Sequence, residues 1–152
     1  VNWEQPEVAE RISEILAGSG IHLLRNEHVE VNGLNFIGFD DYYGFNFNPD
    51  KAISSFDPTK ANTALCHNPD VCDLDVWGAY DSWILSGHTH GGQVKLPFLS
   101  PPIIPVRNKR YTAGQFELSN NRTLYINRAT GHVYQVRFNV RPEITIFELQ
   151  RA

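Results

Sequence analysis

"NTALCHNPDVCDLDVWGAYDSWILSGHTHGGQV", residues 62–94, is the segment that decides the fold. It contains two short apolar runs, "NTALCHN" and "DSWILSG", which stop abruptly at polar or glycine residues, as buried central strands do. Between them, "PDVCDLDVWGAY" predicts a short helix that begins at Pro69. A strand, a helix and a second strand in this order indicate a β-α-β unit, with functional loops at the C-terminal ends of its strands.

The sequence before this segment also alternates helix and strand. "EQPEVAERISEILAGSG" predicts an amphipathic helix with a glycine at its C-terminal end. Strands are expected at "IHLLRN", "HVEVN" and "LNFIGFD", and Asn32-Gly33 is a strong hairpin-turn signal between the last two. A short helix capped by Asn48 or Asp50 is expected within "YYGFNFNPDKAISSFDPTKA".

The sequence after Gly91 is rich in strands. The proline-rich stretch "GGQVKLPFLSPPIIPVRNKRYTAG" precedes two strands in "QFELSNNRTLYINRA", which an Asn120-Asn121 turn joins. A last strand is expected at "EITIFEL". Because no internal repeat or linker interrupts this pattern, residues 1–152 are predicted to form a single α/β domain.

Composition narrows the class of protein. A chain of 152 residues can form one domain, which would bury roughly 68–70% of its unfolded surface. The formal net charge of −4 gives no overall basic field, so nucleic acid is not an expected partner. No apolar stretch approaches the roughly 18 residues of a membrane span. The absence of an initial Met suggests that the natural start, with any targeting signal, lies before Val1, so localisation stays open.

Three of the six histidines directly follow the two apolar runs. Side chains alternate in an extended segment, so His67 and Cys66 should point to opposite faces, with Cys66 in the core if His67 faces a site. By the same argument, an extended "GHTH" would send His88 and His90 the same way. Neutral imidazoles bind Zn, Fe and similar ions, which makes these three histidines candidate metal ligands.

Small and polar neighbours can support these histidines. Gly87, Gly91 and Gly92 would let the backbone approach a ligand and adopt positive φ. Asn68 and Asp70 are candidates to orient the metal-ligating imidazoles through hydrogen bonds.

Other interpretations of the histidines and cysteines stay open. A single histidine at a strand end is more often structural than a ligand, and His22 and His28 are interpreted in that way. The same holds for His132, although its loop, "ATGHV", can approach the site. Cys66 and Cys72 can join His88 and His90 in a structural zinc site, but their spacing is wider than usual and buried free thiols are expected.

The motifs "CHNPD" and "SGHTHGGQ" resemble the C-terminal half of the calcineurin-like metallophosphoesterases. The closer resemblance is to membrane-associated bacterial phosphohydrolases similar to UDP-2,3-diacylglucosamine diphosphatases. It extends to "WEQPEVAERISEILAGSGIHLLRNE" and to the residues after Val106, and so covers essentially the whole chain. It implies the C-terminal half of an αββα sandwich, with mixed sheets and flanking helices.

The resemblance implies two divalent ions, Mn, Fe, Zn or Ni, with His67 and His88 ligating one and His90 the other. The family's remaining ligands and its general-acid histidine come from Asp-x-His, Gly-Asp and Gly-Asn-His motifs, none of which occurs in this chain. The catalytic residues are therefore unassigned. The chain is expected to be a partial domain without its N-terminal half, to hold metal at most partially, and to be inactive alone.

A missing half would have structural consequences. It would remove strands that pair with those at "NTALCHN" and "DSWILSG", so that an N-terminal half or self-association would be needed to cover the exposed strands. The family function would be hydrolysis of phosphodiester, phosphomonoester or pyrophosphate bonds in a phosphorylated small molecule or lipid-linked nucleotide. The alternative is a non-catalytic domain that keeps the fold and binds or supports a partner.

The loop "KLPFLSPPIIPVRNKRY" follows the histidine pair and combines apolar with basic residues. Arg107 and Arg110 are candidate phosphate contacts, because a guanidinium binds phosphate through two hydrogen bonds. The apolar residues make contact with a membrane surface a further hypothesis. The alternative is a proline-stiffened loop that packs on the domain and leaves its basic end in solvent.

Overall fold

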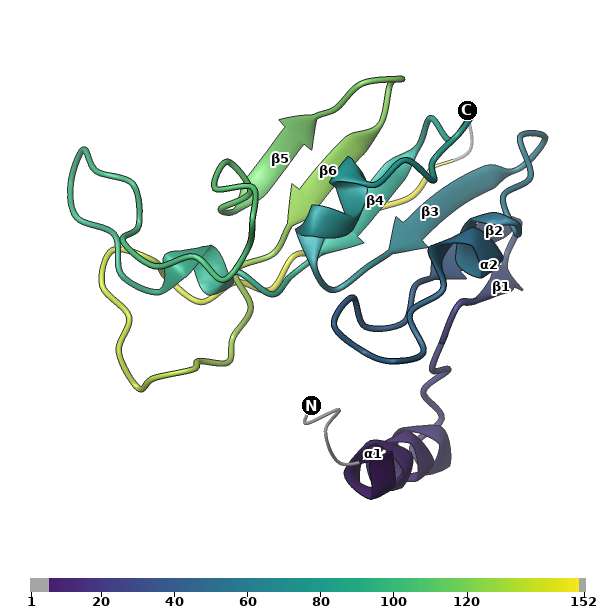
Figure 1. Ribbon diagram of the computed structural model, residues 1–152, viewed down its shortest axis with the longest axis horizontal. Helices are drawn as coiled ribbons and strands as arrows, with labels where there is room; N and C mark the ends of the chain where they lie inside the picture. The colour runs from purple at the N-terminus through teal and green to yellow at the C-terminus, as the bar shows by residue number, and fades with distance from the viewer. Residues whose placement is uncertain (1–5, 151–152) are drawn as a thin grey trace.

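The computed structural model describes residues 6–150, which form one six-stranded mixed sheet with short helices beside it (Figure 1). The helical elements are α1 (Pro6–Gly18), α2 (Pro49–Ile53) and the 3₁₀ turns η1 (Pro69–Asp73) and η2 (His90–Gly92). The strands are β1 (Glu27–Val31), β2 (Leu34–Gly38), β3 (Ala61–Leu65), β4 (Trp83–Ser86), β5 (Gly114–Glu117) and β6 (Thr123–Ile126). The predicted mixed α/β class with flanking helices is confirmed.

The expected β-α-β unit consists of β3, η1 and β4, with β3 and β4 parallel. The strand order is β1-β2-β3-β4-β6-β5, and β2, β3, β4 and β6 all run parallel. Their C-terminal ends therefore meet at one edge of the sheet, where α/β proteins place ligands. Both β3 and β4 have a partner on each side, so the expectation that these two strands lose neighbours is wrong.

Both predicted hairpin turns are confirmed. Asn32 and Gly33 have φ of 52° and 85° between the antiparallel strands β1 and β2. Asn120 and Asn121 have φ of 58° and 56° between β5 and β6. Asparagine and glycine tolerate this left-handed region better than other residues, which is why they mark such turns. The side chain of Asn48 caps α2 by accepting a hydrogen bond from the backbone N–H of Lys51.

One face of the sheet forms the core. Its side chains are fully buried at Ile37, Ala64, Ile84, Leu124 and Ile126. Residues 69–80 and α2 cover this face, and their buried members are Ala52, Val71, Cys72, Trp77 and Tyr80. The side chains of the other face are only partly covered, as the 39% exposure of Trp83 shows.

Two predicted strands are absent from the sheet. The segment "IHLLRN" does not pair, and Asn26 at its end has φ of 55°, which interrupts an extended chain. The segment "EITIFEL" cannot join beside β6, because β4 and β5 already occupy both of its edges. It crosses the open face instead, where the Phe147 ring packs against Trp83 and Tyr125 at centroid distances of 6.3 and 5.3 Å.

The first helix forms as predicted and lies apart from the sheet (Figure 1). Val8 and Ile15 on its apolar stripe are 39% and 59% exposed. Among the described residues, no helix has the length and apolar character needed to cross a membrane.

Candidate metal centre

The parallel pairing of β3 and β4 brings His67 and His88 together. The ladder continues past both strand ends, with the Cys66 N–H donating to the Leu85 carbonyl and the Gly87 N–H donating to the His67 carbonyl, at 3.1 and 3.0 Å. Each histidine therefore leaves the same edge of the sheet. Their rings meet edge to face, with centroids 5.2 Å apart and an interplanar angle of 82°.

The alternation predicted at the end of β3 is confirmed. Cys66 is 2% exposed on the core face, with its Sγ 3.4 Å from the Ser86 Oγ, whereas His67 lies on the other side with access to solvent. Cys66 and Cys72 are both buried free thiols, as expected. The hydrogen bond between the two thiols raises the pKa of Cys72 and lowers that of Cys66, which disfavours the pair of thiolates that a Cys₂His₂ zinc site requires.

The segment "GHTH" is not extended, so the backbone conformation from which a common direction of His88 and His90 was expected is wrong. Their φ values are 66° and 50°, in a region that costs a non-glycine residue on the order of 1–3 kcal/mol. The Thr89 hydroxyl stabilises this conformation by donating to the Thr112 carbonyl at 2.5 Å and accepting from the Gly91 N–H at 3.2 Å. Non-glycine residues held in this region are typical of functional sites.

The three glycines act in two different ways. Gly91 and Gly92 have the expected positive φ, and a Cβ at Gly92 would lie 2.3 Å from that of Pro101. The expectation of positive φ was wrong for Gly87, which continues the extended ladder of β4. A Cβ there would lie 3.6 Å from the His67 Nδ1, which is an ordinary contact, so the packing around this ring does not require glycine at position 87.

Backbone carbonyls orient the other two imidazoles. The Nε2 atom of His88 lies 2.8 Å from the Pro105 carbonyl oxygen, and the Nδ1 atom of His90 lies 3.2 Å from that of Gly131. Because a carbonyl only accepts, these nitrogens carry the hydrogen in the neutral rings. We assign the free lone pairs on this basis to Nδ1 of His88 and Nε2 of His90, the arrangement that metal-ligating histidines commonly have.

The predicted support by Asn68 and Asp70 is indirect. The Asn68 side chain caps η1 by accepting from the Asp70 N–H at 2.9 Å. Buried Asp70 accepts the backbone N–H groups of Arg107 and Asn108 at 2.7 and 3.0 Å. It therefore holds the loop whose Pro105 carbonyl orients His88. Among the described residues, neither side chain forms a hydrogen bond with an imidazole, and the Nδ2 of Asn68 is buried without a partner.

Arg107 lies on the flank of the histidines. Its guanidinium carbon is 5.7 Å from the centroid of Tyr42, whose ring packs against Tyr43, and the Tyr43 ring lies 5.9 Å from that of His88. Arg110 is exposed on the same loop. Both arginines remain candidates to contact a phosphate.

The electrostatic surroundings favour neutral imidazole at His67. Desolvation by the surrounding protein and the nearby His88 lower the pKa of His67, against the opposing effect of the Asp41 carboxylate. Asp41 was not among the predicted site residues. The sequence feature that could have identified Asp41 is "GFDD", residues 38–41. It begins at the last residue of β2, the parallel neighbour of β3.

A hollow of about 370 Å³ lies beside His67 on the open face of the sheet. His22 and the side chains of Leu24, Leu65 and Leu85 line it. The sequence had assigned His22 a structural role, and only the tertiary structure brings it to the same hollow as His67. His132 reaches the site through its loop alone, since the neighbouring Gly131 binds His90.

The described residues supply only part of a metal site. Among them, no group of three or more His, Cys, Asp or Glu side chains is arranged to hold a metal ion. The adjacent rings of His67 and His88, with nitrogens oriented by carbonyls, fit the imidazole share of such a site. They do not fit a complete two-metal centre, which also needs a bridging ligand.

Comparison with known proteins identifies bacterial proteins of similar sequence. The chain is 34% identical to phosphodiesterase YaeI of Escherichia coli over 97% of its length, and 32% identical to UDP-2,3-diacylglucosamine pyrophosphatase LpxG of Chlamydia muridarum over 87%. It is 33% identical over 86% of its length to the uncharacterized metallophosphoesterase YkuE of Bacillus subtilis. It covers 56%, 42% and 43% of these proteins, respectively.

The chain thus spans about half the length of the curated relatives it matches. No protein-family model matches it, and no solved structure matches it significantly. The relatives are named a phosphodiesterase, a pyrophosphatase and a metallophosphoesterase, and their similarity extends over 86–97% of the chain. These similarities support the assignment of the chain to the metallophosphoesterase family.

Proposed function

We propose that this chain supplies the histidine side of a metal-dependent phosphoesterase centre, with His67 and His88 on one ion and His90 on a second. The observation that carries the proposal is the 5.2 Å approach of the His67 and His88 rings at the C-terminal ends of parallel strands. The fixed nitrogens of His88 and His90 support it. Family membership supports divalent metals in general.

The residues of the chain have separate roles in this proposal. The low pKa of His67 keeps its ring able to donate a lone pair at neutral pH. Pro105 and Gly131 hold the other two rings in orientation. Bound divalent ions would supply Lewis-acid stabilisation of charge on a phosphoryl group. Arg107 would orient the phosphate from the flank.

The substrate class is a phosphodiester, a phosphomonoester or a pyrophosphate in a small molecule or a lipid-linked nucleotide. The names of two relatives, phosphodiesterase and UDP-2,3-diacylglucosamine pyrophosphatase, support this range. An alternative is a domain that binds a phosphorylated partner without hydrolysis. The lack of a complete ligand group among the described residues is the observation that favours it.

Titration of the chain with Mn²⁺ or Zn²⁺ in a calorimeter tests the proposal. His67→Ala or His88→Ala should weaken binding of the metal at least about tenfold, because each removes a ligand. His28→Ala, in the edge strand β1, is the matched control and should bind like the unsubstituted chain. Absence of binding in the unsubstituted chain, or an equal loss in the control, would reject the histidine site. Because the chain supplies only part of the centre, hydrolysis of a chromogenic phosphodiester is expected only from a protein that also carries the remaining ligands, and metal binding without hydrolysis by that protein would favour the alternative domain.

A further inference from the structure

Residues 40–48 connect β2 to α2 and carry four aromatic side chains, and we call this segment the aromatic loop. Tyr42 and Phe47 are partly buried against the core, and their rings meet edge to face with centroids 5.3 Å apart. Tyr43 and Phe45, by contrast, are 47% and 93% exposed. The loop therefore has an inner aromatic pair that anchors it and an outer pair that solvent reaches.

The side chain of Asn26 holds the two ends of the aromatic loop together. Asn26 is buried, and its Oδ1 accepts the backbone N–H groups of Asp40 and Asn48 at 3.1 and 3.2 Å. Its Nδ2 donates to the Asn46 carbonyl at 2.7 Å. These hydrogen bonds fix the shape of the loop before any ligand arrives, which lowers the entropic cost of binding to it.

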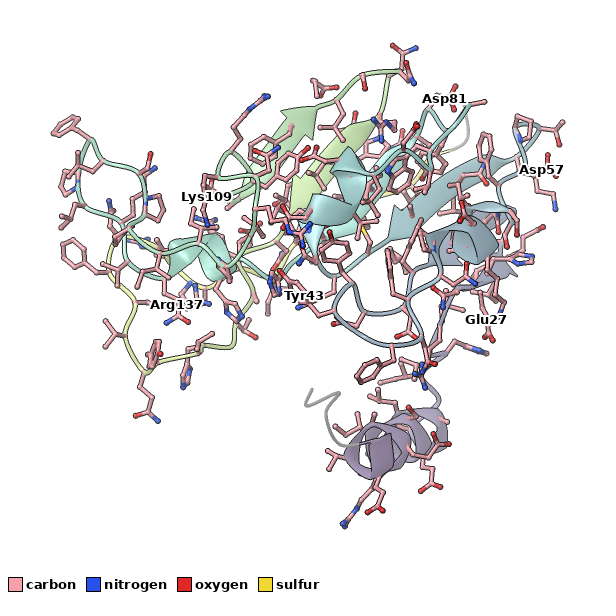
Figure 2. The ribbon with its side chains drawn as sticks, in the orientation of Figure 1. Glu27, Tyr43, Asp57, Asp81, Lys109 and Arg137 are labelled. Carbon is pink, nitrogen blue, oxygen red and sulfur yellow. The ribbon has the colours of Figure 1, made fainter. Side chains whose placement is uncertain are left out.

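The Tyr43 ring lies beside the candidate metal centre. The Asp41 carboxylate accepts the Tyr43 backbone N–H at 2.8 Å, and the centroids of the Tyr43 and His88 rings are 5.9 Å apart. Figure 2 shows Tyr43 on the side of the loop that is nearer to η2, the element that begins at His90. A ligand held through a metal ion at His88 would therefore have Tyr43 as a neighbour.

Arg107 brings a positive charge to the same place. Its guanidinium carbon is 5.7 Å from the centroid of Tyr42, and the Tyr42 and Tyr43 rings are 5.2 Å apart. A guanidinium over an aromatic face is attracted by the electrons of the ring, so Tyr42 holds Arg107 close to Tyr43. An imidazole, a guanidinium and a half-exposed aromatic ring thus lie next to one another.

We propose that Tyr43 stacks against the base of a nucleotide whose phosphate binds at His67 and His88. This inference rests on the proposed function and narrows its substrate class to nucleoside phosphates. Every base has a flat π-face that stacks on an aromatic side chain. One sugar separates the base of a nucleotide from its phosphate, so the two parts can reach adjacent groups of one site. Tyr43 next to His88 and Arg107 provides such a pair of groups.

Two other kinds of substrate match the aromatic loop less well. An acyl chain packs on aliphatic side chains, of which the loop has none. A sugar without a base presents hydroxyl groups, which need hydrogen-bond acceptors. The two carboxylates of the loop already accept hydrogen bonds within the protein, Asp40 from Arg25 at 3.0 Å and Asp41 from the Tyr43 N–H. A flat and largely apolar group is the better match for an exposed ring.

Calorimetric titration of the chain with AMP and with ribose 5-phosphate, both in the presence of Mn²⁺, tests the proposal. The two probes carry the same phosphate on the same sugar carbon, so the ratio of their dissociation constants reports the base alone. AMP should bind at least about fivefold more tightly. Tyr43→Leu should remove this preference and leave the affinity for ribose 5-phosphate unchanged, whereas Tyr43→Phe should keep the preference. Tyr134→Leu is the matched control, because Tyr134 is a 74% exposed tyrosine in the segment after β6, and it should also keep the preference.

Equal affinity of the unsubstituted chain for the two probes would overturn the inference and leave the proposed function intact. Absence of binding by both probes would reject the phosphate site of the proposed function, and the inference with it. A preference for AMP that survives Tyr43→Leu, or that Tyr134→Leu removes, would mean that the base does not stack on Tyr43. Hexyl phosphate that binds as tightly as AMP would assign the aromatic loop to an apolar chain instead. Circular dichroism of each variant separates loss of binding from loss of fold.

Discussion

The two faces of the sheet are built from alternate residues of the same strands, yet they differ in how completely they are covered. On the core face, Ile84 and Leu124 are fully buried beneath residues 69–80. On the open face, the neighbouring Trp83 is 39% exposed and is covered in part by Phe147. Residues 69–80 and α2 cover the core face, whereas within residues 6–150 the open face is covered in part by the C-terminal segment and the residues before β1.

The core face stabilises the fold, whereas the open face carries the candidate site. The core face carries the tightly packed apolar cluster, and its residues contact one another rather than solvent. The open face carries the hollow beside His67 and the histidine edge. A ligand site needs accessible space, which a completely packed face would not provide.

The sharpest test of this comparison uses two adjacent residues of β4. Ile84→Ala should lower the free energy of unfolding by about 2–5 kcal/mol, because it leaves a cavity in a fully packed core. Leu85→Ala removes a half-buried side chain on the open face and should cost about 1 kcal/mol. Urea denaturation of both variants measures the difference. Equal losses would mean that the open face is as well packed as the core.

The second test concerns Asp70, which connects the core side to the site. Asp70→Asn should lower the free energy of unfolding by about 1.5–3 kcal/mol, because a carboxylate that accepts two buried backbone N–H groups is replaced. It should also weaken metal binding about tenfold through the Pro105 carbonyl and His88.

Calorimetry and urea denaturation measure the two effects of Asp70→Asn separately. Asp81→Asn, an exposed carboxylate away from the histidines, serves as the control and should change neither quantity. If Asp70→Asn lowers stability but leaves metal affinity unchanged, the loop does not position His88.

The third and smallest test concerns the C-terminal segment on the open face. Burial raises the pKa of Glu143, but hydrogen bonds from Tyr125, Arg128 and Thr145 outweigh it and lower the pKa to about 2 from the usual 4.5. Because the folded pKa is the lower one, the stabilisation by Glu143 is fully present above pH 4.5. It is lost progressively as the pH falls from 4.5 toward 2.

Glu143→Gln should therefore destabilise the protein near pH 7 and flatten the loss of stability between pH 4.5 and 2. Thermal unfolding measured at several pH values in this range checks the prediction. Glu117→Gln on the exposed strand β5 is the control. Parallel curves for Glu143→Gln and the unsubstituted protein would show that the C-terminal segment contributes little to covering the open face.

Much of the fold and part of the site could be predicted from local pattern. The alternation of strand side chains placed Cys66 in the core and His67 outside it, and both hairpin turns followed from asparagine and glycine. The family resemblance came from short motifs around the histidines, and the relatives confirm it. These features depend on residues within a few positions of one another.

The remaining features depend on contacts between distant segments. "EITIFEL" has the composition of a strand, but β5 occupies the edge of β6 that this segment would need. The left-handed conformation of His88 and His90 depends on Thr89 and its bond to the Thr112 carbonyl, 23 residues away. No residue type predicts which backbone carbonyl will orient an imidazole, because every residue has one.

The sequence by itself determined the β-α-β unit, the turns, the family and the identity of the three candidate ligands, since each rests on residue type and short spacing. Only the tertiary structure decided how those histidines are oriented, that Asp41 lies near His67, and that Asp70 supports His88 through a loop. It also decided that the Gln93 side chain forms hydrogen bonds with the backbone of Val133, Tyr134 and Val136. The physical reason is that strand pairing and backbone hydrogen bonds form across the chain, between groups that the local sequence does not distinguish.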